Sequence, residues 1–76
     1  MSQKLPAVKG KDAARVAQRL GFELRRQRGS HAIYVRSSDK ARVVIPMHAG
    51  TDLKQKTLRG IIDDLKTTPE EFLKLL

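Results

Sequence analysis

Residues 22–36 read FELRRQRGSHAIYVR, and this stretch decides the fold. It opens with alternating apolar and polar side chains, and its second half, residues 31–36, is rich in strand-forming residue types. The Arg-Gly-Ser sequence at 28–30 is typical of a tight turn, because glycine and serine favour turn conformations. We therefore predict a β-hairpin with strands over residues 22–27 and 31–36.

A third strand is predicted over residues 41–47, ending near Pro46 because proline has no N–H to donate to a neighbouring strand. The pattern leaves open which face of the second strand points into the core. Ile33 and Val35 lie on one face of that strand, and Tyr34 lies on the other. Together the three strands predict an antiparallel meander.

Apolar residues at helical spacing predict a helix on each side of the meander. The first covers residues 11–20 with Gly10 as its N-cap, and the second is capped by Thr57. A capping box at residues 68–71 predicts a short third helix. Because helices on one face of an antiparallel sheet form a two-layer α+β domain, we predict a single domain over residues 1–76. Its order is α-β-β-β-α plus a short C-terminal helix.

The charge of the chain is +8, from 16 basic and 8 acidic side chains. Residues 1–50 carry 11 basic and 3 acidic side chains, whereas residues 51–76 carry 5 of each. Such a positive field attracts a polyanion, so we predict contact with nucleic acid. No basic amphipathic helix and no run of roughly 20 apolar residues is present, so we expect no binding to membranes. The lack of cysteine suits a reducing compartment, so we expect a cytoplasmic protein.

Two histidines, His31 and His48, are the candidates for chemistry near neutral pH. The chain has no cysteine and no metal-ligand or nucleotide-loop spacing, so we predict no metal and no cofactor. A Ser-His-Asp hydrolase is disfavoured, because Ser30 adjoins His31 and neighbours on a strand point to opposite faces. Acid–base cleavage of RNA remains: a base deprotonates the 2′-hydroxyl, and an acid protonates the leaving 5′-oxygen.

On the residues alone, His31 is either this acid–base group or a turn histidine bonded to nearby backbone. His48 is either an auxiliary group or a histidine that holds its loop. The cations predicted to dock RNA are Lys11, Arg15, Arg25, Arg26 and Arg28. Arginines on an edge strand also serve simply to prevent aggregation. The alternative functions are a non-catalytic RNA-binding module and a ribosome-associated basic protein.

Five short motifs follow one another along the chain: Gly21-Phe22, Gly29-Ser30-His31, Pro46-Met47-His48, Thr57-Leu58-Arg59 and Glu70-Glu71-Phe72-Leu73. With these motifs the chain resembles the HicA toxins, small mRNA interferases of toxin–antitoxin pairs, from Val8 to Leu76. The resemblance implies a fold like a double-stranded-RNA-binding domain, and His31 as the catalytic residue in a turn shaped by Gly29 and Ser30. It also implies that translated RNA is the substrate and that a HicB-type antitoxin binds the toxin and covers His31.

Overall fold

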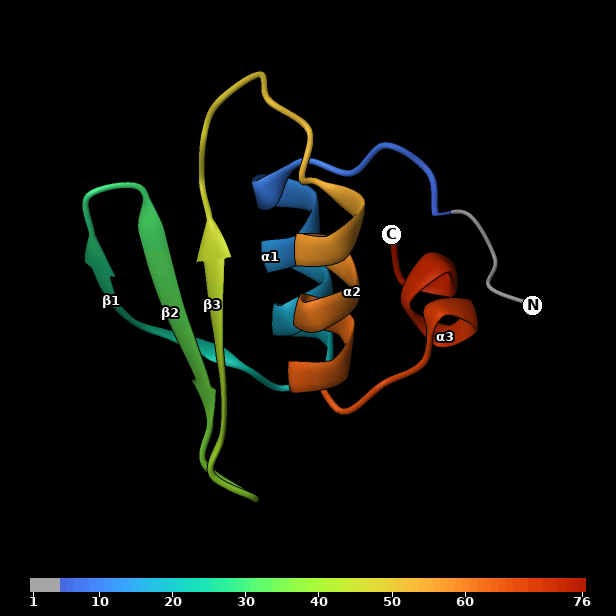
Figure 1. Ribbon diagram of the computed structural model, residues 1–76. Coiled ribbons are helices and arrows are strands. Elements are labelled where there is room, and N and C mark those ends of the chain that lie inside the picture. The colour runs from blue at the N-terminus through green and yellow to red at the C-terminus, as the bar shows by residue number, and fades with distance from the viewer. Residues whose placement is uncertain (1–4) are drawn as a thin grey trace.

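Residues 5–76 are described by a computed structural model, in which three helices and three strands follow one another along the chain (Figure 1). They are α1 (Gly10–Arg19), β1 (Glu23–Arg28), β2 (His31–Arg36), β3 (Ala41–Pro46), α2 (Gln55–Asp64) and α3 (Pro69–Lys74). This order confirms the predicted α+β class, with three central strands and a short C-terminal helix. The predicted domain began at Met1, and residues 1–4 lie outside the described part of the chain.

The strands form one antiparallel sheet in the order β1-β2-β3, so β2 is central. Helices α1 and α2 both contact β3 and cover one face of this sheet, and α3 packs against α2 (Figure 1). Alternation along β2 places His31, Ile33 and Val35 on the other face, which we call the open face. Within residues 5–76, no helix has the length and apolar character needed to cross a bilayer.

The pairing of β2 with β3 shows which face of the sheet enters the core. Ala32 and Tyr34 belong to the buried core and lie opposite Ile45 and Val43 of β3. Ile33 is also shielded, at 8% exposure, but it stands outside the core cluster because it lies on the open face. The question left open by the sequence is therefore settled in favour of the Tyr34 face.

Apolar stripes on the helices complete the core. Ala13, Val16 and Ala17 of α1 are fully buried, as their spacing predicts, and Leu20 packs at the edge. The later part of the chain contributes Leu58, Ile61, Ile62, Leu65 and Phe72. Burial of each large apolar side chain stabilises the fold by about 1.5–3 kcal/mol relative to an exposed one. The two helices are thereby held against the sheet.

The start of α1 differs from the prediction. Gly10 is the first helical residue, and Lys9 occupies the N-cap position, where its backbone N–H donates to Oδ2 of Asp12 at 3.3 Å. Gly10 is buried against the end of β3. A Cβ at Gly10 would collide with the carbonyl oxygen of Pro46 and would stand 3.2 Å from Cα of Met47. Lack of a side chain at this position therefore allows α1 to contact the end of β3 directly.

The start of α2 also differs, since the helix begins two residues before Thr57 and the prediction of Thr57 as its N-cap is wrong. A tertiary contact sets this start: the Leu53 N–H donates to the Val8 carbonyl at 2.7 Å just before the helix. The predicted cap of α3 is confirmed, because Oγ1 of Thr68 accepts a hydrogen bond from the Glu71 N–H at 3.2 Å.

Arg36 joins the far end of the sheet to α1. Its guanidinium donates to both carboxylate oxygens of Asp39, at 3.0 and 2.9 Å, and to the carbonyl of Leu20 at 2.9 Å. It also lies 4.6 Å from the centre of the Phe22 ring. The hydrogen bonds from Arg36 lower the pKa of Asp39 to about 2, and the same bonds raise the pKa of Arg36.

Candidate functional site

His31 is the first residue of β2, directly after the two-residue turn at Gly29 and Ser30. Gly29 has φ of +58°, a left-handed conformation that costs other residues about 1–2 kcal/mol. The His31 side chain is exposed, and its strand position lies opposite Arg28 in β1 and Pro46 in β3. The turn therefore presents the imidazole to solvent at one end of the sheet.

The loop after β3 brings a second histidine to this turn. The Met47 N–H donates to the Ser30 carbonyl at 2.6 Å, which extends the pairing of β2 and β3 by one step. Oγ of Ser30 lies 3.4 Å from Nε2 of His48, and the imidazole tautomer decides which group donates. Ser30 thus contacts the loop through both its backbone and its side chain.

His31 and His48 line one open hollow of about 270 Å³, which we call the histidine hollow. Its far side is formed by residues at the start of α2, including Lys54 and Thr57. Two imidazoles from different parts of the chain therefore reach the same solvent-accessible space. Such a pair allows one ring to accept a proton while the other donates one.

The histidine hollow favours an anion. It adjoins the first turn of α2, where backbone N–H groups have no acceptor within the helix and carry a partial positive charge. Lys54 is exposed at its rim. Asp52 also lines the hollow, but its carboxylate accepts a hydrogen bond from Nζ of Lys9 at 3.0 Å. A phosphate group suits this combination of a cation and free N–H donors.

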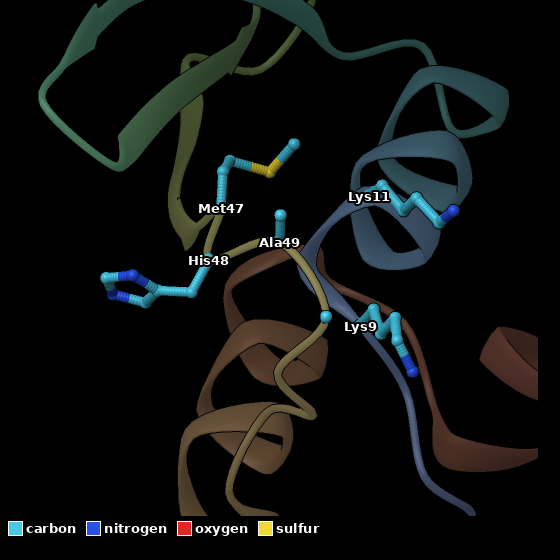
Figure 2. A pocket seen from close by; sticks show the side chains of 6 residues that line it. Lys9, Lys11, Met47, His48 and Ala49 are labelled. Atoms are coloured by element: carbon cyan, nitrogen blue, oxygen red, sulfur yellow. The ribbon is translucent and has the colours of Figure 1, made fainter.

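A second hollow, of about 290 Å³, also has His48 in its wall, and we call it the lysine hollow. Lys9 and Lys11 at the start of α1 form one side, and the loop after β3 forms the other (Figure 2). Figure 2 shows the His48 ring pointing away from both lysines, whereas the Ala49 methyl group faces the space between Met47 and Lys11. The loop after β3 therefore lies between two hollows, one lined by lysines at the start of α1 and the other by His31 and the start of α2.

Three of the predicted RNA-docking cations lie on β1, and all three are exposed. Arg28 pairs across the sheet with His31, and Arg26 lies two residues away on the same open face. Arg25 is the additional residue at a β-bulge, where the register of β1 against β2 shifts. The hairpin therefore places Arg26 and Arg28 on the face that carries His31.

The other two predicted cations, Lys11 and Arg15, both lie on α1 but have different surroundings. Lys11 lines the lysine hollow. Arg15 is exposed, pairs with Asp12 at 3.3 Å and lines neither hollow. The structure consequently brings Lys11, but not Arg15, to the loop that carries His48.

Lys9, Lys54 and Thr57 were not predicted as site residues. Lys9 and Lys54 each directly precede a helix. Apart from this local position, their sequence context does not indicate that they lie near the histidines. Their proximity to the histidines depends on long-range contacts, such as the backbone bridge between Lys9 and Asp52. Such long-range contacts cannot be predicted from local sequence patterns.

Within residues 5–76, no three histidine, aspartate or glutamate side chains are grouped so that they would hold a metal ion. A family model described as the HicA toxin of bacterial toxin–antitoxin systems matches residues 10–67 of the chain. The match runs from the start of α1 to just beyond α2 and includes both histidines. The comparison with curated proteins gives no match.

Proposed function

The chain belongs to the HicA toxin family of bacterial toxin–antitoxin systems, and from this premise we propose that it is a metal-independent endoribonuclease that cleaves mRNA in the cytoplasm. The family membership makes it a toxin with an antitoxin partner. The observation that carries the proposed activity is the presence of His31 and His48 in one solvent-accessible hollow.

In the proposed reaction, one imidazole accepts the proton of the RNA 2′-hydroxyl, and the 2′-oxygen attacks the adjacent phosphorus. The bond from phosphorus to the 5′-oxygen breaks, and the second imidazole gives its proton to that oxygen. The products are a 2′,3′-cyclic phosphate and a 5′-hydroxyl end. His31 is the principal catalytic residue, and His48 supplies the second proton transfer. Each positioned acid or base contributes about 10²–10⁴-fold to the rate.

Positive groups around the histidines support the phosphate chemistry. Lys54 and the first-turn N–H groups of α2 stabilise the charge that develops on the phosphoryl oxygens. Arg26 and Arg28, on the same face as His31, hold the RNA backbone through its phosphates. Gly29 and Ser30 form the turn that directly precedes His31, and Ser30 also contacts His48.

The test is cleavage of a defined RNA oligonucleotide by the purified protein in the presence of a chelator. We expect cleavage that leaves a cyclic phosphate, loss of at least about 100-fold in rate in His31→Ala, and no cleavage at a position carrying a 2′-deoxy sugar. Gln18→Ala, an exposed change on α1 outside both hollows, serves as the matched control.

Three results contradict the proposal: equal cleavage by His31→Ala, loss of activity in chelator, or cleavage at the deoxy position. Salt-sensitive binding of RNA that stays intact identifies the protein as a non-catalytic RNA-binding module instead.

We further propose that the partner is an acidic HicB-type antitoxin that covers His31. The exposure of His31 on a face flanked by Arg26 and Arg28 supports this, because a partner placed there blocks the imidazole and complements the arginines. Growth arrest on expression, relieved either by His31→Ala or by co-expression of an acidic HicB-type antitoxin, is the expected result. Arrest that persists in His31→Ala contradicts the role assigned to this residue.

A further inference from the structure

We propose that the lysine hollow is a binding subsite for the one nucleotide that comes next along the RNA after the two that flank the scissile phosphate. This inference rests on the proposed ribonuclease function and adds to it the place where the substrate chain continues. Its starting point is His48, which lies in the walls of both hollows. RNA that places a phosphate between His31 and His48 contacts this residue, and the lysine hollow is the space on its other side.

The walls of the lysine hollow are fixed before any ligand arrives. Gly10 packs directly against the end of β3, so the start of α1 is in direct contact with the beginning of the loop. Nζ of Lys9 binds Asp52 at 3.0 Å, and the Thr51 N–H donates to the His48 carbonyl at 3.2 Å. A site whose shape is formed in advance does not lose binding free energy to ordering of its own groups.

The lining matches the two chemical parts of a nucleotide. Met47, Ala49 and the aliphatic stems of the lysines provide an apolar wall for the flat face of a base, and a methionine sulfur makes favourable contacts with aromatic rings. Lys11 provides a cation for the phosphate. Its ammonium has no acidic partner within residues 5–76, whereas the charge of Lys9 is already paired with Asp52.

The size of the hollow restricts the ligand to one small group. Its volume of about 290 Å³ lies at the lower limit of the roughly 300–1,000 Å³ found for small-molecule sites. A single base fits this scale. An apolar wall that recognises a base by stacking tolerates different sequences, since every base has a π-face. A nucleotide is therefore favoured over a protein segment, which would need a longer groove.

The experiment uses the full chain carrying His31→Ala, so that RNA is bound without being cut, and 2′-O-methyl RNA di- and trinucleotides as probes. We expect the trinucleotide to bind about tenfold more tightly than the dinucleotide, in the range that one additional stacked base provides. Its binding shifts the NMR methyl signals of Met47 and Ala49. Ala49→Leu, which fills the hollow, removes the advantage of the trinucleotide. Ala7→Leu adds the same bulk at an exposed position outside both hollows and preserves it.

Lys11→Ala provides a second variant that removes the cation without filling the space, and we expect it to weaken trinucleotide binding more than dinucleotide binding. The proposal is wrong if the trinucleotide shifts only the protein NMR signals near residue 31 and Thr57. It is equally wrong if Ala49→Leu keeps the same trinucleotide advantage as Ala7→Leu. It is also wrong if Ala49→Leu binds RNA normally but escapes its antitoxin, because the hollow then belongs to that partner. Failure of the ribonuclease function is seen separately, as equal RNA cleavage by wild type and His31→Ala.

Discussion

Oγ of Ser30 lies 3.4 Å from Nε2 of His48 and so links the turn before β2 to the loop after β3. The contact ties the second imidazole to the turn that directly precedes His31, and both histidines line the histidine hollow. A weak polar contact at an exposed site stabilises little by itself. Its importance for the proposed reaction is geometric, since a misplaced acid or base loses much of its effect.

Ser30→Ala is therefore expected to reduce RNA cleavage by about tenfold, less than the 10²–10⁴-fold expected from removing an acid–base group in His48→Ala. The double variant is expected to be no slower than His48→Ala, because the serine acts only through the histidine. Single-turnover cleavage rates of the three variants measure this. Additive losses in the double variant would show that Ser30 contacts the RNA independently of His48.

Removal of Arg28 and of Arg15 should affect RNA binding differently. Arg28 lies opposite His31, whereas Arg15 is paired with Asp12 and lines neither hollow. For single-stranded RNA, Arg28→Ala is expected to weaken binding and to lower the salt slope by about 0.7, the value for one lost phosphate contact. Arg15→Ala is expected to leave the slope unchanged. Affinity measured across a salt series decides this, and equal slopes for the two variants would remove Arg28 from the interface.

Gly10→Ala is expected to destabilise the fold by about 1–3 kcal/mol, the usual cost of adding an atom where there is no space. The added methyl group meets backbone at Pro46 and Met47, which cannot rotate away as a flexible side chain does. Denaturant unfolding of the variant measures the loss. Stability equal to wild type would mean that α1 shifts freely, and the lysine hollow would then not be preformed.

Replacement of two other glycines by alanine is expected to change the stability of the fold in opposite directions. Gly60 is exposed inside α2 with open space around it, so Gly60→Ala is expected to stabilise the protein by about 0.5–1 kcal/mol. Gly29 also has open space, but its φ of +58° makes Gly29→Ala destabilising by about 1 kcal/mol. Thermal unfolding of both variants provides the comparison, and changes of the same sign would contradict it.

Because Arg36 lowers the pKa of Asp39, we predict that the stability of the fold depends on pH in the acid range. The pKa of Asp39 is lowered from 3.8 to about 2 by the hydrogen bonds from Arg36, so its contribution is fully present above about pH 4. That contribution is lost as pH falls toward 2. Wild type should therefore lose its stability advantage over Asp39→Asn across this interval, as measured by urea unfolding at each pH. A constant difference from pH 6 to pH 2 would exclude this role of the pair.

Local patterns were sufficient to predict the sheet, the three helices and the start of α3, but not the starts of α1 and α2. The bounds of β2 and the cap at Thr68 follow from strand-forming residues and turn chemistry alone. Gly10 and Thr57 were misassigned because contacts with distant segments determine where α1 and α2 begin. The same limit applies to the site: His31 was recognisable from its turn, whereas the approach of Lys54 and Lys9 depends on how the loop folds back.

The hydrogen bond from Leu53 to Val8 joins residues 45 positions apart, and it bears on the order in which the parts of the candidate site come together. The β1–β2 hairpin with His31 is complete once Arg36 has left the ribosome. Both hollows, however, include the loop after β3, and the histidine hollow also needs Thr57. The exposed histidine therefore belongs to a local hairpin, whereas the hollow around it forms only when segments far apart in the chain come together.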